Sequence, residues 1–180
     1  TQVEMDPRRV RRVVRNLLGN AIEHGEGRPI IVTVDSDQEA VAIGVRDFGL
    51  GMKPEDVERV FDRFWRADPS RKRSIGGTGL GLSIALGDAR LHHGTLGVWS
   101  QLGHGTHFVL TLPRSGGISN PESPIRLEPD DGASAAIDAL GATVPIDVSE
   151  LIELNRMDGG GFGRAGGGGT SDTGSGRPRV

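Results

Sequence analysis

Two asparagines four residues apart, Asn16 and Asn20, could present their side-chain amides from one side of a helix. The surrounding stretch "VVRNLLGNAI" has apolar residues at helical spacing, which places both amides on the same face. Amide oxygens suit hard cations, and Mg²⁺ shares its coordination shell with water and phosphate oxygens. The pair therefore indicates a magnesium–phosphate site, with solvated or capping amides as the alternative.

A second group is "DFGLG", in which Asp47 closes an alternating apolar stretch and Gly49 and Gly51 follow. An ionised carboxylate only accepts hydrogen bonds, so it suits an amino group, and glycines allow a ligand to approach the backbone. Asp and Gly are also ordinary turn residues, so this group indicates a binding site only together with others.

A glycine-rich stretch, "GGTGLGLSI", stands directly before a predicted helix, whose first N–H groups attract anions. It follows a basic stretch that includes Arg63 and Arg66, and arginines hold phosphates well. A capping loop and solvated charges are the alternatives. No Lys-Ser/Thr follows the glycines and no strand precedes them, which argues against a Walker A loop and a dinucleotide fingerprint.

The elements that would position these groups follow from capping and periodicity. Asp6-Pro7 predicts the start of a helix over 7–24 that ends at Gly25. Alternating apolar residues and helical spacing predict strands at 28–36, 39–47, 95–100 and 106–113, and helices at 53–64 and 79–94. This order predicts an α/β two-layer sandwich, with a mixed sheet covered on one face by about three helices.

Composition divides the chain into a domain over 1–114 and a tail over 115–180. The tail holds 14 of the 29 glycines and a single aromatic residue, Phe162, so we expect it to be disordered. The chain has no cysteine, which excludes disulfides and thiolate metal sites. No apolar run reaches about 18 residues. We expect no membrane contact by this chain and no nucleic-acid partner.

Together these groups resemble the ATP-binding catalytic domain of bacterial two-component sensor histidine kinases, in the GHKL superfamily. The similarity covers roughly residues 4–113. The matching motifs are "NLLGNAIEH" for the N box, "DFGLGM" for the G1 box, "FDRFWR" for the F box, "GGTGLGLSI" for the G2 box and "GHGTHFVLTLP" for the end of the domain. The resemblance implies the Bergerat fold, with ATP and Mg²⁺ as cofactors.

The resemblance also implies roles for particular residues. Asn20 would ligate Mg²⁺ beside Asn16, Asp47 would accept from the adenine amino group, and Gly51 would let the base approach. Arg63 and Arg66 would neutralise phosphates, and residues 67–78 would form a mobile lid. The implied ATP-binding set is Asn16, Asn20, His24, Asp47, Gly49, Gly51, Arg63, Arg66, Gly77, Thr78, Gly79, Leu80, Gly81, Leu82 and Thr106. Catalysis is assigned to Asn16, Asn20, Arg63 and Arg66.

Several features depart from the family pattern. Glu23 stands where many members carry a basic residue, and most of the strand that usually precedes the first helix is missing. None of the five histidines is followed by an acidic residue, as the family's phosphoacceptor box requires. The resemblance therefore implies transfer of the γ-phosphate to a histidine on a separate dimerisation domain, and from there to a response regulator. The domain would be the cytoplasmic part of a membrane-anchored sensor.

The residue type at position 16 distinguishes a kinase from a hydrolase in this superfamily. ATPases of this superfamily carry a Glu there as general base, and a neutral amide cannot accept a proton near pH 7. This favours transfer to an acceptor that arrives from elsewhere. A stand-alone GHKL ATPase or serine-kinase anti-sigma factor, and a catalytically silent nucleotide-binding adaptor, remain as alternatives.

Overall fold

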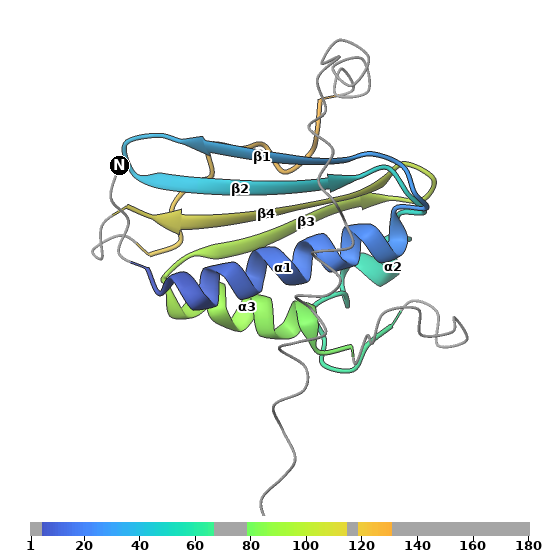
Figure 1. The fold of residues 1–180 in the computed structure, drawn as a ribbon, viewed down its shortest axis with the longest axis horizontal. Coiled ribbons are helices and arrows are strands. Elements are labelled where there is room, and N and C mark those ends of the chain that lie inside the picture. Colours follow the sequence, from blue (N-terminus) through green and yellow to red (C-terminus); the bar gives the residue numbers. More distant parts are fainter. Residues whose placement is uncertain (1–4, 67–78, 115–118, 131–180) are drawn as a thin grey trace, which may run out of the picture. The chain divides into compact units, whose positions relative to one another are not determined.

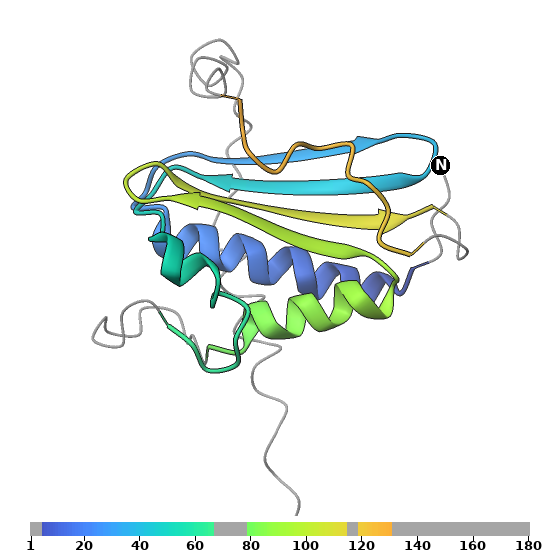
Figure 2. The same ribbon diagram turned by 180° about the vertical axis from the view of Figure 1, so that it is seen from behind.

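A computed structural model describes residues 5–66, 79–114 and 119–130 of the 180-residue chain. The sheet forms one layer and the helices form a second layer against one of its faces (Figures 1 and 2). The elements in chain order are α1 Pro7–His24, β1 Ile30–Ser36, β2 Ala40–Asp47, α2 Pro54–Val57, α3 Gly81–Leu91, β3 Thr95–Gln101 and β4 Gly105–Pro113. The predicted two-layer sandwich with three helices is confirmed.

The described sheet is antiparallel throughout, so the prediction of a mixed sheet is wrong for these strands. Its order is β1-β2-β4-β3, and every neighbouring pair is antiparallel. The helical connection does bring β3 back in the same direction as β2. Because β4 lies between them, however, these two strands never pair, and each ladder joins strands of opposite direction.

Helix α1 starts and packs as its sequence predicts. The Asp6 side chain caps it by accepting a hydrogen bond from the Arg8 N–H at 2.9 Å, and Pro7 occupies the first turn. Val13, Leu17 and Ala21 form its buried face. They pack with residues of α3 and the sheet into one core. This burial holds the face with Asn16 and Asn20 at the edge of the core.

Helix α2 is shorter than predicted, because it ends at Val57 and the chain continues as turns through Phe64. Phe64 has φ 64°, a left-handed conformation that a helix cannot contain. Phe61, on this turn segment, packs edge-on against Phe108 of β4 with ring centroids 6.3 Å apart. Phe61 therefore contacts the core, whereas the i, i+3 spacing of the two aromatics, which suggests that Phe64 does too, is misleading because Phe64 is 71% exposed.

A buried carboxylate fixes α3 against α1. The Asp88 side chain is 4% exposed and accepts hydrogen bonds from Arg12 Nε and Nη2, both at 2.7 Å, and from Arg9 Nη1 at 3.1 Å. Burial raises the pKa of Asp88, but the hydrogen bonds from Arg12 and Arg9 outweigh it and leave this pKa below its ordinary value. This clamp joins the C-terminal half of α3 to α1, and Asn16 joins the first residue of α3, Gly81, to α1 one turn further along.

Residues 119–130, here called the strap, contact the sheet instead of belonging to a disordered tail, which corrects that part of the 115–180 prediction. The strap crosses the sheet face opposite the helices, in orange in Figure 2. The Asn120 N–H donates to the His93 carbonyl at 2.9 Å, and the Leu127 carbonyl lies 2.8 Å from His107 Nδ1. The glycine-rich C-terminal end dominates the composition of residues 115–180, so composition does not distinguish the short stretch "NPESPIRLEPD" from the rest of the tail. Residues 131–180 lie outside the described part.

Candidate active site

The two helical asparagines lie half-buried on α1, as predicted. Asn16 Nδ2 donates to the carbonyl of Gly81, the first residue of α3, at 2.9 Å. This hydrogen bond uses the amide nitrogen and leaves the amide oxygen of Asn16 as an acceptor. Within the described residues, the side chain of Asn20 forms no hydrogen bond, so its amide is available to a ligand.

Asp47 ends β2 and is 2% exposed. Its Oδ1 accepts hydrogen bonds from the Gly49 N–H at 3.0 Å and the Thr106 N–H at 3.3 Å. Burial raises the pKa of Asp47, while these two hydrogen bonds and the charges of Arg46 and His24 partly oppose it. No described residue donates a hydrogen bond to Oδ2. The group is a buried, oriented acceptor with one oxygen open to a donor.

The glycines after Asp47 are required by neighbouring backbone. A Cβ at Gly49 would lie 1.9 Å from the His24 carbonyl oxygen, and one at Gly51 would lie 1.9 Å from the Gln101 carbonyl oxygen. Gly51 also has φ 63°, which favours glycine. The loop is thus held between the C-terminus of α1 and the β3–β4 turn. The role of Gly51 in admitting an adenine ring stays a prediction.

A hydrogen bond joins described residues that lie on either side of the segment 67–78. The Phe64 N–H donates to the Gly79 carbonyl at 2.9 Å, and Gly79 has φ 71°. A Cβ at Gly79 would lie 3.0 Å from Phe64 backbone atoms. We call this contact the latch. The predicted lid 67–78, with Gly77 and Thr78, lies outside the described residues.

Helix α3 begins directly after the latch and has no side-chain cap. Leu80 occupies the N-cap position, and the structure gives no capping hydrogen bond from a side chain to the first turn at Gly81 and Leu82. The first N–H groups of such a helix have no intrahelical partner and favour an anion. Because Gly81 contacts Asn16, these N–H groups lie next to the α1 amides.

The structure thus brings six of the fifteen predicted residues into two clusters, and Arg63 and Arg66 bond to neither. Asn16 and Gly81 meet between the helices. His24, Asp47, Gly49 and Thr106 meet at one end of the sheet. Arg63 is exposed and Arg66 is half-buried, and neither forms a hydrogen bond or ion pair with another described residue.

Sequence reasoning missed Ser100, near the end of β3. Its Oγ accepts from the Met52 N–H at 2.9 Å, donates to the Gly105 carbonyl at 2.9 Å and lies 3.0 Å from Thr106 Oγ1. Ser100 therefore joins the glycine loop to the start of β4. Its only sequence signal is a small hydroxyl residue at a predicted strand end, which is too common to single out.

A metal at this site would depend on amide and phosphate oxygens. Among residues 5–66, 79–114 and 119–130, no three His, Asp or Glu side chains are arranged to hold a metal ion. The open amide of Asn20 fits a hard cation that shares its shell with phosphate and water. No described helix is both long and apolar enough to cross a bilayer.

Known proteins resemble this chain in both sequence and structure. Sensor histidine kinase MtrB of Mycobacterium leprae is 49% identical over 126 residues, 70% of this chain and 22% of that protein. WalK of Bacillus subtilis, also a sensor histidine kinase, is 40% identical over 114 residues, 62% of this chain and 19% of that protein. The chain spans about a fifth of the length of these curated relatives.

Two solved structures share the fold at a TM-score of 0.53 and 30% identity: the mycobacterial sensor histidine kinase MprB and the catalytic domain of histidine kinase ThkA. Each match covers 62% of this chain, with 76% of the MprB chain and 71% of the ThkA chain. A family model described as histidine kinase-, DNA gyrase B-, and HSP90-like ATPase matches residues 5–116. This match covers more than half of the sequence and contains both residue clusters, so the chain belongs to the family of histidine kinase-, DNA gyrase B- and HSP90-like ATPases.

Proposed function

We propose that this chain is the ATP-binding catalytic domain of a sensor histidine kinase. It binds Mg²⁺–ATP and donates the γ-phosphate to a histidine on a separate dimerisation and phosphoacceptor domain. The observation that carries this proposal is the carboxylate of Asp47, buried and held by two backbone N–H groups with its second oxygen open. Such a group suits the adenine amino group and has little to gain in a purely structural role.

The phosphate end is supported by the junction of α1 and α3. The uncapped N-terminus of α3 supplies N–H donors, and the amides of Asn16 and Asn20 lie beside it. Mg²⁺, held through the Asn20 oxygen, would neutralise phosphate charge during transfer. The latch between Phe64 and Gly79, the described residues near either side of 67–78, supports a lid over this helix terminus.

Transfer, as opposed to hydrolysis, is supported by the hydrogen bond of Asn16. Its Nδ2 donates to the Gly81 carbonyl, a contact that a glutamate cannot make because an ionised carboxylate has no donor. The residue therefore holds α3 in place and cannot activate water. Catalysis then depends on positioning the phosphates and neutralising their charge, with the nucleophile supplied by the acceptor domain.

Calorimetric titration with a non-hydrolysable ATP analogue, with and without Mg²⁺, tests this proposal. We expect Asn20→Ala to weaken Mg²⁺-dependent binding by about tenfold or more, because the metal loses a protein ligand. Without Mg²⁺ the variant should bind the analogue nearly as well as the unmodified chain.

The matched control is Gln38→Ala, which removes an exposed amide in the β1–β2 turn and should leave both titrations unchanged. Equal losses for Asn20→Ala with and without Mg²⁺ would contradict the metal role. Absence of analogue binding by the unmodified chain would contradict the proposed function itself.

A further inference from the structure

The sheet face opposite the helices has an unusual set of side chains. Alternation along the strands places Arg46, His107 and Trp99 in one cross-strand row, and Gly44, Val109 and Gly97 in the next. Val109 is 3% exposed and His107 is 6% exposed, although none of the described helices covers this face. The strap is the segment that contacts them, so we call this surface the strap face.

Two glycines in strand interiors make room on this face, Gly97 for the strap and Gly44 for the ring of His107. A Cβ at Gly97 would lie 3.0 Å from Leu127 Cδ1, and a Cβ at Gly44 would lie 2.8 Å from His107 Nε2 and 3.7 Å from Ile125. Glycine weakens a strand interior, so Gly97 indicates close approach of another segment, while Gly44 leaves Ile125 in ordinary contact distance. Here the approaching side chains are Leu127 and Ile125 of the strap.

A hydrogen bond between a histidine side chain and the strap backbone fixes the register of the strap. The Leu127 carbonyl lies 2.8 Å from His107 Nδ1. Because a carbonyl oxygen only accepts, Nδ1 carries the proton and donates it to Leu127. The contact therefore selects one tautomer of a buried histidine and aligns the strap across the Gly97 row.

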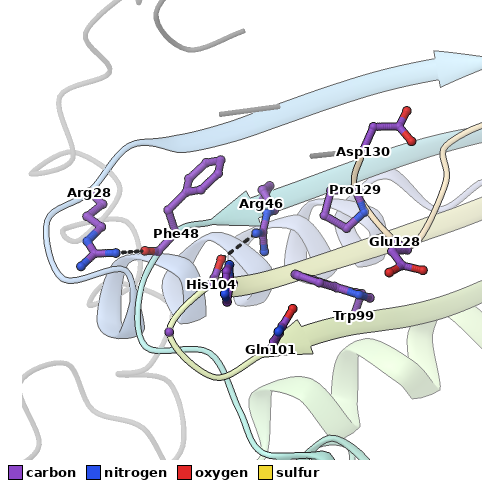
Figure 3. Close-up of a pocket in the computed structure, with 10 residues that line it drawn as sticks. Arg28, Arg46, Phe48, Trp99, Gln101, His104, Glu128, Pro129 and Asp130 are labelled. Carbon is purple, nitrogen blue, oxygen red and sulfur yellow. Dashed lines mark hydrogen bonds between the residues drawn. The ribbon is translucent and has the colours of Figure 1, made fainter. Parts of the chain in front are cut away.

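The acidic end of the strap reaches a cavity of about 250 Å³ at the edge of the same face (Figure 3). Arg46 lines it, with its guanidinium carbon 4.8 Å from the centre of the Phe48 ring and 4.7 Å from that of Trp99. Arg46 is 8% exposed; its Nη2 donates to the His104 carbonyl at 2.6 Å. Its Nε and Nη1 are buried and have no partner among the described residues.

The strap brings two carboxylates to this cavity, and one of them is unpaired. Asp130 forms an ion pair with Arg126 at 3.0 Å. Glu128 also lines the cavity and forms no ion pair or hydrogen bond with another described residue. A buried guanidinium with unsatisfied donors gains most from a charged acceptor, so Glu128 is the natural partner of Arg46.

We propose that the strap face is a docking surface for an extended acidic segment and that residues 119–130 occupy it in cis. The Gly44–Val109–Gly97 row receives Ile125 and Leu127, His107 fixes the register, and the Arg46 pocket takes the Glu128 carboxylate. This inference does not depend on nucleotide binding. It adds the strap to the folded catalytic domain as the segment that covers its second face.

Docking of the strap also stabilises a loop of the proposed nucleotide site. Arg46 precedes Asp47 in β2, and it holds the β3–β4 turn through the His104 carbonyl. In the same turn, the Gly103 N–H donates to the Leu50 carbonyl at 2.7 Å. Securing Arg46 therefore braces the loop that carries Gly49 and Gly51. We expect strap variants to lower nucleotide affinity less than Asp47 variants, because the strap acts only through this loop.

Limited trypsin digestion of the full chain tests docking at the Arg126–Leu127 bond. A protease must take up an extended segment around this bond, so docking should slow cleavage strongly relative to a free peptide of residues 119–131. We expect Leu127→Ser and Gly97→Ala each to raise the cleavage rate about tenfold. Gly87→Ala is the matched control for Gly97→Ala, because nothing lies within 4 Å of its added Cβ.

The pocket has its own test in the same assay. We expect Glu128→Gln to raise the cleavage rate about tenfold in the unmodified background, and to have no further effect when combined with Arg46→Met. Leu127→Ser and Glu128→Gln change only the strap, so they stay informative if a sheet variant fails to fold. Cleavage of the unmodified chain as fast as the free peptide would overturn docking, and additive effects of Glu128→Gln and Arg46→Met would overturn the carboxylate assignment.

Discussion

Asp47 and His107 are buried ionisable groups that point to opposite faces of the sheet, and burial favours the neutral form of each. Burial raises the pKa of Asp47 and lowers that of His107. Two backbone N–H groups partly offset the effect on Asp47, and the hydrogen bond to Leu127 partly offsets that on His107. The proposed ligand binding therefore depends on the charge state of Asp47, and the proposed docking of the strap depends on the charge state of His107.

Asp47→Asn should reduce ATP-analogue affinity without reducing stability. The asparagine oxygen can still accept from Gly49 and Thr106, but its amide nitrogen would then face the adenine amino group with a second donor. We expect a loss of about tenfold to a hundredfold in affinity by calorimetry. Because the raised pKa of Asp47 means that ionisation costs folding free energy above that pKa, the variant should melt at or above the parent temperature.

The control is Asp35→Asn, an exposed carboxylate on β1, which should change neither affinity nor melting. A fall in melting temperature for Asp47→Asn, with affinity unchanged, would assign Asp47 a structural role instead.

Protonation of His107 should lower the free energy of unfolding of the domain in mild acid. Its folded pKa is lowered from the ordinary 6.5, mainly by burial, with the charge of Arg46 contributing. The unfolded chain therefore binds the proton more tightly, so this contribution is complete above about pH 6.5 and is lost as pH falls toward the lowered pKa. Urea unfolding at several pH values should show this loss, and His107→Gln should reduce it. An unchanged slope in His107→Gln would assign it to other groups.

At the scale of elements, the position of one helix terminus decides the geometry of the candidate site. Asp88 joins α3 to α1 through Arg9 and Arg12, and Asn16 joins the same helices one turn further along α1. The uncapped N-terminus of α3 therefore has little freedom relative to α1. Local capping of α3 is replaced by these interhelical contacts, which leaves its first N–H groups to a ligand.

Asp88→Asn should both destabilise the domain and weaken nucleotide binding. Loss of charge leaves Arg9 and Arg12 with weaker acceptors, and we expect a cost of about 1–3 kcal/mol in urea unfolding. The pKa of Asp88 is lowered, so its contribution is present above about pH 3.8 and is lost as pH falls through the folded value. The difference between variant and parent should shrink in acid.

Asp62→Asn is the comparison, because it breaks an exposed pair with Arg59 at 3.5 Å and should cost no more than about 0.5 kcal/mol. Equal costs for the two variants would contradict the role of the buried clamp.

At the scale of the molecule, one face of the described sheet carries the helices and the proposed nucleotide site, and the opposite face carries the strap. The helix face carries the apolar core, whereas the strap face carries glycines, a histidine and a stacked arginine. The chain spans about a fifth of the length of its curated relatives. We therefore expect the phosphoacceptor to be a separate domain.

The chain alone should not acquire acid-labile phosphate from labelled Mg²⁺–ATP, whereas a histidine hairpin from the cognate full-length protein should be labelled when added. The reason is that no histidine of this chain precedes an acidic residue, and Asn16 cannot activate water. A hairpin with its histidine replaced by alanine is the control. Steady ATP hydrolysis by the chain alone would favour the stand-alone ATPase alternative.

Local signals in the sequence sufficed to place the candidate site residues of the helix face on their elements. Spacing placed Asn16 and Asn20 on one side of α1, alternation placed Asp47 at a strand end, and glycine content marked the loops around them. Placement on the elements is predictable because helical period, strand alternation and glycine's conformational freedom act over a few neighbouring residues; the ligand roles stay predictions.

The strap face was decided only by the tertiary structure. No local pattern marks Arg46 or His107, and Leu127 falls within the predicted glycine-rich tail. Their contacts join residues 20 to 81 positions apart, and they depend on strand order and register, which no local pattern encodes. For the same reason the sequence could not predict that the described sheet is antiparallel. Strands β2 and β3 run in the same direction, and only the tertiary structure shows that β4 lies between them.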